Sequence, residues 1–154
     1  DAEFAHIMGH EISHALANHT AERMSRAIAT NLGIAVVGAT SQTPEITTTG
    51  AMLAAKLALE LPNSRTAESE ADEIGIELAT RAGYAPEAAV TLWKKMGALG
   101  GSRPAEFLST HPAPENRQAA LAELADEVRK LNPGGRLSEV YPVTIIQDNS
   151  QFAR

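Results

Sequence analysis

The chain has 154 residues, enough for a single domain with a substantial hydrophobic core. Its formal net charge of -6, and the absence of any dense lysine or arginine stripe, argue against nucleic acid as a partner. The chain contains no cysteine, which excludes disulfides and thiolate metal ligands, and no apolar stretch approaches the roughly 18 residues of a membrane-spanning helix.

Helical patterns of apolar residues dominate the first third of the chain. In residues 2–18 the apolar side chains spread around the helical wheel, which predicts a helix buried on more than one side. Residues 21–31 predict a second helix, which runs into a flexible connection with two glycines at 32–39. The threonine-rich residues 41–49, with a proline among them, predict a loop.

Four more helices are expected after this loop. They are predicted, in order, at 50–61, 64–81, 86–96 and 114–131. Pro62 is expected to end the first of them, because proline is tolerated in the first turn of a helix but not inside it. Pro114 stands at a favourable position to begin the last.

The C-terminal residues carry a different pattern. The run from Asn132 to Gly135 ends the last helix, and residues 136–154 are expected to form a tail with one candidate strand, Val140–Gln147. The sequence thus predicts one mostly helical domain over 1–135, followed by this tail.

The region from Ile28 to Leu61 is weakly apolar throughout, which admits two interpretations. Its helices either pack on the core or form a flap that touches a membrane. We favour packing on the core, because the longest apolar run is far too short to span a bilayer.

Residues 10–14 read His-Glu-Ile-Ser-His, which predicts a catalytic zinc site. In an α-helix this spacing places His10 and His14 one turn apart on the same face, with Glu11 beside them. Two such imidazoles can bind one tetrahedral ion, and the adjacent carboxylate can accept a proton from a water on that ion. We therefore expect one zinc ion per chain and Glu11 as the catalytic base.

A catalytic zinc needs a third protein ligand and an open position. A histidine six residues after His14 would supply it in one well-known arrangement, but Thr20 stands there. His19 would lie on the opposite side of a continuous helix from His10, so we expect it at the surface or in a helix cap. His6, one turn before His10, is expected to pack or to support the site rather than to bind the ion.

Residues 68–72 contain two glutamates that could be this ligand, and helical periodicity separates them. Asp72, Gly75 and Ala79 fall within about 40° of Glu68 on the helical wheel, whereas Glu70 belongs to a charged, solvated face. The small residues beside Glu68 allow close approach to another helix, which favours Glu68 as the ligand. Asp72 can accept the free N–H of a ligating histidine and orient its ring. The alternative is a charged helix face that holds no metal.

These motifs resemble those of the zinc metallopeptidase family that includes HtpX, BepA and the CAAX prenyl proteases. The resemblance rests on residues 10–14, on 64–65 with 68–72, and on Thr110-His111-Pro112 with Arg117. It covers residues 1 to about 131 and is closest to the BepA-like and OMA-like branch.

The family resemblance implies an α+β, predominantly α, gluzincin-type fold. It also implies that Glu68 is the third zinc ligand, in agreement with the helical wheel. Family members bind substrate on a sheet upstream of the active helix, so residues 1–135 are expected to form a catalytic domain that lacks most of this sheet.

The function that the resemblance implies is a zinc-dependent endopeptidase. Its expected substrates are unfolded or misfolded proteins or peptides, and its expected place is the bacterial periplasm or envelope. Membrane association would require parts outside this chain, and the oligomeric state is left open. The alternative is a latent or inactive metal-binding module that binds peptides or acts like a chaperone.

His111 and Arg117 complete the predicted site residues. His111 precedes a proline and is therefore expected in an extended segment, where residue types alone favour a surface histidine. The resemblance implies that this segment lies over the zinc, where His111 either fills the open coordination position or donates to the developing oxyanion. We expect the plugging role to dominate in a chain without substrate. Arg117, just inside the first turn of the helix expected to begin at Pro114, is expected to contact the ligands rather than the metal.

Overall fold

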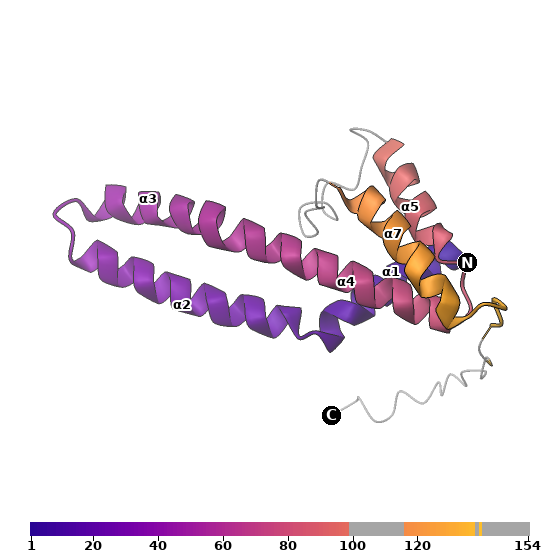
Figure 1. Cartoon of the computed structure of the whole chain (residues 1–154). Helices are drawn as coiled ribbons and strands as arrows, with labels where there is room; N and C mark the ends of the chain where they lie inside the picture. The colour runs from indigo at the N-terminus through magenta and orange to yellow at the C-terminus, as the bar shows by residue number, and fades with distance from the viewer. Residues whose placement is uncertain (99–115, 138, 140–154) are drawn as a thin grey trace, which may run out of the picture.

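The computed structural model describes residues 1–98, 116–137 and 139 (Figure 1). These residues form the helices α1 (Ala2–Leu16), α2 (His19–Ala39), α3 (Pro44–Ala55), α4 (Leu61–Arg81), α5 (Glu87–Ala98) and α7 (Arg117–Val128). A π-helical turn, η1 (Lys56–Glu60), joins α3 to α4, and a 3-10 turn, η3 (Arg129–Leu131), follows α7.

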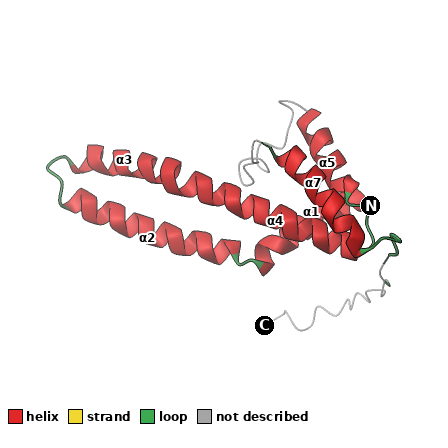
Figure 2. Ribbon diagram, in the orientation of Figure 1, coloured by secondary structure: helices red, strands yellow, loops and turns green. Residues whose placement is uncertain are grey.

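The predominantly α fold class is confirmed. Within the described ranges every regular element is a helix (Figure 2). The candidate strand Val140–Gln147 lies outside the described residues. The helices predicted at 64–81 and 86–96 are present as α4 and α5, with boundaries shifted by only a few residues.

The apolar core lies where α4, α5 and α7 meet. Its buried members are Ile76, Ala89, Leu121, Ala125 and Val128. Helix α1 packs against both α4 and α5, so the helix that carries the His-Glu-Ile-Ser-His motif lies beside this core. Burial of these side chains holds α4 and α7 in a fixed relation to each other.

Helices α1 and α4 cross at two glycines. A Cβ atom added to Gly9 would lie 2.6 Å from the carbonyl oxygen of Gly75, and one added to Gly75 would lie 2.7 Å from the backbone nitrogen of His10. Any larger residue would push the two helices apart. The predicted close approach at the small residues after Glu68 is therefore confirmed.

The apolar side of α1 is exposed, which corrects the prediction of a helix buried on more than one side. Its buried residues are His6, Gly9, His10 and Ser13. Phe4, Met8, Ile12 and Leu16 are exposed in the described structure. The crossing with α4 selects the polar and small face of α1, because only that face permits the close contact at Gly9.

Helices α2 and α3 pack against each other and extend away from the other helices as a hairpin (Figure 1). The favoured prediction, that the region from Ile28 to Leu61 packs on the core, is therefore wrong. At Gly38 a Cβ atom would lie 2.5 Å from the Thr48 methyl carbon, so the two helices touch closely near the turn between them. No helix in the part of the chain that the structure describes is long and apolar enough to cross a membrane.

Of the two interruptions predicted within this hairpin, one is absent and the other is shorter than expected. Residues 32–39 continue α2, and α3 begins at Pro44 within the predicted loop, because proline suits the first turn of a helix. The hydroxyl groups of Thr48 and Thr49 donate hydrogen bonds to the carbonyl oxygens of Pro44 and Glu45, respectively, so these polar side chains are hydrogen-bonded within the helix.

Pro62 does not end a helix, contrary to prediction. It stands in the first turn of α4, directly after η1, so α3, η1 and α4 form one continuous rod. A π-helical turn changes the hydrogen-bond register just before a residue that has no N–H to donate. The rod carries Glu68 and Asp72 back from the hairpin to α1.

Gly75→Ala tests the crossing of α1 and α4. The added methyl group meets the backbone of His10, so we expect a loss of about 1 to 3 kcal/mol in the free energy of unfolding. The matched control is Gly33→Ala in α2, where the added atom would meet nothing within 4 Å. This control should be neutral or stabilising by up to about 1 kcal/mol, because alanine favours helix. Equal urea unfolding curves for the two variants would contradict the proposed role of Gly75.

Candidate metal centre

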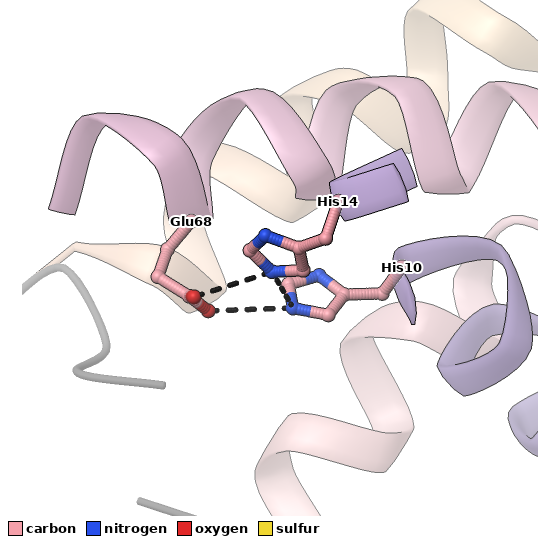
Figure 3. A group of neighbouring side chains, drawn as sticks. All are labelled: His10, His14 and Glu68. Carbon is pink, nitrogen blue, oxygen red and sulfur yellow. Dashed lines mark hydrogen bonds and ion pairs between the residues drawn. The ribbon is translucent and has the colours of Figure 1, made fainter. Parts of the chain in front are cut away.

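Three side chains from two helices converge on one point. His10 and His14 come from α1 and Glu68 from α4, and their metal-binding atoms all lie within 4.8 Å of one another (Figure 3). Nε2 of His10 lies 3.3 Å from Oε2 of Glu68, and Nε2 of His14 lies 3.3 Å from Oε1 of the same carboxylate. The two Nε2 atoms are 3.1 Å apart.

These separations fit a tetrahedral metal ion. Zinc binds histidine nitrogen and carboxylate oxygen at about 2.0 to 2.2 Å, which places two ligand atoms of a tetrahedron about 3.3 to 3.5 Å apart. In the structure the two Nε2 atoms are 3.1 Å apart, and each lies 3.3 Å from one oxygen of the Glu68 carboxylate, Oε2 for His10 and Oε1 for His14. Two histidines and one glutamate also form a known donor set of catalytic zinc sites. The residues present therefore fit a zinc ion with an open position.

Asp72 orients the ring of His10. Its Oδ1 atom lies 3.0 Å from Nδ1 of His10, and both side chains are buried. A carboxylate accepts, so Nδ1–H of His10 donates to Asp72, which leaves Nε2, the ring nitrogen nearer to Glu68, as the atom that can bind a metal. A hydrogen bond of this kind fixes the tautomer that a metal ligand needs.

Arg117 lies behind the ligands, in the first turn of α7. Its guanidinium is ion-paired with Asp72 at 2.5 Å and with Glu68 at 3.5 Å, and its central carbon lies 3.5 Å from the centre of the Trp93 ring. The side chain is only 4% exposed. A buried guanidinium between two carboxylates and an aromatic face offsets charge that would otherwise be costly to bury.

The acidic surroundings of His10 shift its pKa upwards. Burial by itself lowers the pKa, but the hydrogen bonds to Asp72 and Glu68 outweigh it and raise the pKa from 6.5 to about 9. In the metal-free chain at neutral pH, His10 therefore carries a proton on both ring nitrogens and is positively charged. A metal ion at Nε2 must displace the proton on that nitrogen, so binding releases it.

His19 and His6 occupy places that the sequence predicted only in part. His19 is buried, 8% exposed, and its Nδ1 lies 2.9 Å from Nδ1 of His14, so the prediction of a surface or capping residue is wrong. The chain turns at Asn18, whose φ of 58° breaks the helix and brings His19 back toward the site. His6 is buried and donates from Nε2 to the carbonyl of Ala85 at 3.0 Å, which agrees with a packing role.

Of the remaining predicted residues, the structure describes Glu11 and Glu70, and both are exposed. Glu11 lies in α1 next to His10 and is exposed to solvent. Glu70 is exposed, in agreement with its predicted solvated face. His111 lies outside the described residues.

Comparison with known proteins agrees with this geometry. Residues 1–125 match the profile of peptidase family M48. The chain belongs to that family. Members of peptidase family M48 are metal-dependent, which accords with the group formed by His10, His14 and Glu68. No solved structure gave a significant match.

Several characterised relatives are similar over most of this chain. It is 40% identical over 126 residues to the mitochondrial metalloendopeptidase OMA1 of Arabidopsis thaliana, an alignment that covers 80% of this chain and 24% of that protein. OMA1 of Saccharomyces cerevisiae is 36% identical, with 76% and 34% covered. The beta-barrel assembly-enhancing protease of Escherichia coli K12 is 33% identical, with 85% and 29% covered. The chain thus spans about a quarter to a third of the length of these M48 relatives.

Glu68→Gln is expected to weaken zinc binding far more than Glu73→Gln, which removes an exposed carboxylate from the same helix. Asp72→Asn should fall between them, with a loss of about ten- to hundredfold, because it disturbs only the orientation of His10. Competition with a chromophoric chelator measures the three dissociation constants. Similar values for the Glu68 and Glu73 variants would exclude Glu68 as a ligand.

The raised pKa of His10 predicts a pH-dependent stability of the metal-free chain. Protonated His10 stabilises the fold fully below its unfolded pKa of 6.5, and this contribution is lost as the pH rises to about 9. In EDTA, the free energy of unfolding should therefore fall between these pH values. The His10→Gln variant should lack this component, and identical pH profiles for the two proteins would contradict the assignment.

Proposed function

We propose that this chain carries the catalytic centre of a zinc-dependent endopeptidase, with residues 1–135 as the catalytic domain and 136–154 as a tail. The observation that carries the proposal is the convergence of His10, His14 and Glu68 at distances that suit a tetrahedral ion. Similarity to metalloendopeptidases over most of the chain supports it.

In the proposed mechanism, different residues of this chain bind the metal, act as the general base and orient the ligands. His10, His14 and Glu68 would hold the zinc, which when bound supplies a Lewis acid that polarises a scissile carbonyl and makes water more acidic. Glu11, adjacent to His10 and exposed, accepts the proton of the attacking water and returns it to the leaving amine. Asp72 and Arg117 keep the ligands oriented and their buried charges balanced.

The proposed substrates are unfolded or misfolded proteins and peptides. Peptidase family M48 implies a protein or peptide substrate, and the finer statement follows the beta-barrel assembly-enhancing proteases among the relatives. The relatives include both mitochondrial and bacterial proteins. We place this chain with the bacterial group, in quality control of the periplasm or envelope, and membrane association would come from parts outside this chain.

His111 is proposed to plug the open coordination position when no substrate is bound. His111→Ala should then raise peptidase activity while zinc stays bound. A lower kcat with zinc retained would instead identify His111 as a donor to the developing oxyanion. Unchanged kinetics would refute both roles.

Glu11→Gln tests the division of labour between base and ligands. It should keep about one zinc per chain and lower the rate of casein cleavage by about a hundredfold or more, because general-base catalysis is lost. His14→Ala should lose the metal, and Glu73→Gln serves as the charge-matched control on an exposed position. Elemental analysis and a cleavage assay give the two readouts. A wild-type chain that binds zinc and peptide without cleaving it would favour the alternative, a latent peptide-binding module.

A further inference from the structure

Besides the hydrogen bond from His10 to Asp72, a chain of two hydrogen bonds leads from His14 to the exposed side of α4. Nδ1 of His14 lies 2.9 Å from Nδ1 of His19, and Nε2 of His19 lies 3.3 Å from Oε2 of Glu70. The rings of His14 and His19 meet edge to face, with centroids 4.9 Å apart. His19 is buried, whereas the side chain of Glu70 is 53% exposed.

We propose that His19 and Glu70 are positioning residues for the metal ligand His14. The inference rests on the proposed zinc site, and it gives both imidazole ligands the same kind of support. Nδ1 of His10 reaches a carboxylate directly, at Asp72. Nδ1 of His14 reaches one through an intervening imidazole.

One assignment of protons in the two neutral rings satisfies both contacts. A carboxylate only accepts, so His19 donates from Nε2–H to Glu70, and its Nδ1 then carries a lone pair. That lone pair accepts from Nδ1–H of His14. The proton of His14 is thereby held on Nδ1, which leaves the lone pair of Nε2 directed at Glu68 and the metal position.

The opposite assignment is incompatible with metal binding. If His14 accepted a hydrogen bond at Nδ1, its proton would sit on Nε2, the atom that lies 3.1 Å from Nε2 of His10 and 3.3 Å from Glu68. That atom would then present a hydrogen instead of a lone pair to the ion. Glu70 selects the productive form through His19, without touching His14.

A pair of variants at His19 separates hydrogen bonding from packing. His19→Phe keeps an aromatic ring but removes both nitrogens, and it should weaken zinc binding by about ten- to hundredfold. His19→Gln keeps an acceptor for His14 and a donor for Glu70, so it should retain most of the affinity. The metal-free melting temperature of the two variants is measured alongside, because a loss that came only from misfolding would appear there as well.

Glu70 acts through His19, so the two residues must be coupled. Glu70→Ala should weaken zinc binding severalfold in the wild type and leave the affinity of His19→Phe unchanged. Glu73→Ala removes an exposed carboxylate from the same helix and should change neither. A double-mutant cycle of dissociation constants measures this coupling.

The outcomes also distinguish this inference from the proposed function. Full affinity in His19→Phe, or equal losses for Glu70→Ala in both backgrounds, would overturn the positioning role while the zinc site stands. A chain that shows the expected coupling but cleaves no peptide would overturn the peptidase proposal and keep the positioning role. A wild-type chain that binds no zinc would overturn both.

Discussion

At the crossing of α1 and α4 backbone meets backbone, because Gly9 and Gly75 leave no room for a Cβ atom on either side. Helices separated by ordinary side chains pack with their axes about 8 to 10 Å apart. Here the glycines allow the short approach that places two imidazoles of α1 against two carboxylates of α4. The rod formed by α3, η1 and α4 therefore has two differently packed ends (Figure 1). Helix α4, which carries the crossing with α1, also packs on the core, and α3 at the other end packs on α2.

The charges buried at the crossing explain how the centre can exist both without a metal ion and with one. With both carboxylates ionised, Glu68 and Asp72 are balanced in the metal-free chain by Arg117 and by protonated His10. A divalent ion that displaces the proton of His10 leaves one positive charge in excess. Such an excess suits a site where negative charge develops on a substrate oxygen. The guanidinium of Arg117 thus balances buried negative charge in the metal-free chain. When a metal ion is bound, it adds to the positive charge that would stabilise a developing oxyanion.

Sequence patterns alone were enough to predict the parts of the site that lie within single helices. His10, Glu11 and His14 share a face because helical periodicity is local, and the same periodicity separated Glu68 and Asp72 from the solvated Glu70. The mostly helical fold followed from the same patterns. Arg117 was found by resemblance and not by any physical signal in the sequence, although its contacts with Asp72 and Trp93 account for it.

The packing partners of each helix, and the places where the helices bend, depend on contacts between distant parts of the folded chain. The amphipathic patterns of α1, α2 and α3 did not reveal that much of their apolar surface is exposed, because a pattern shows that a face exists and not what covers it. The local signal at Pro62 predicted a break where the helical rod continues, and Pro44, predicted to lie inside a loop, begins α3. His19 gave no sign of its place, because a continuous helix points it away from the ligands and a single left-handed residue, Asn18, returns it to them. Periodicity is a property of neighbouring residues, whereas the contacts around His14 depend on segments about 50 residues apart that meet only when the chain is folded.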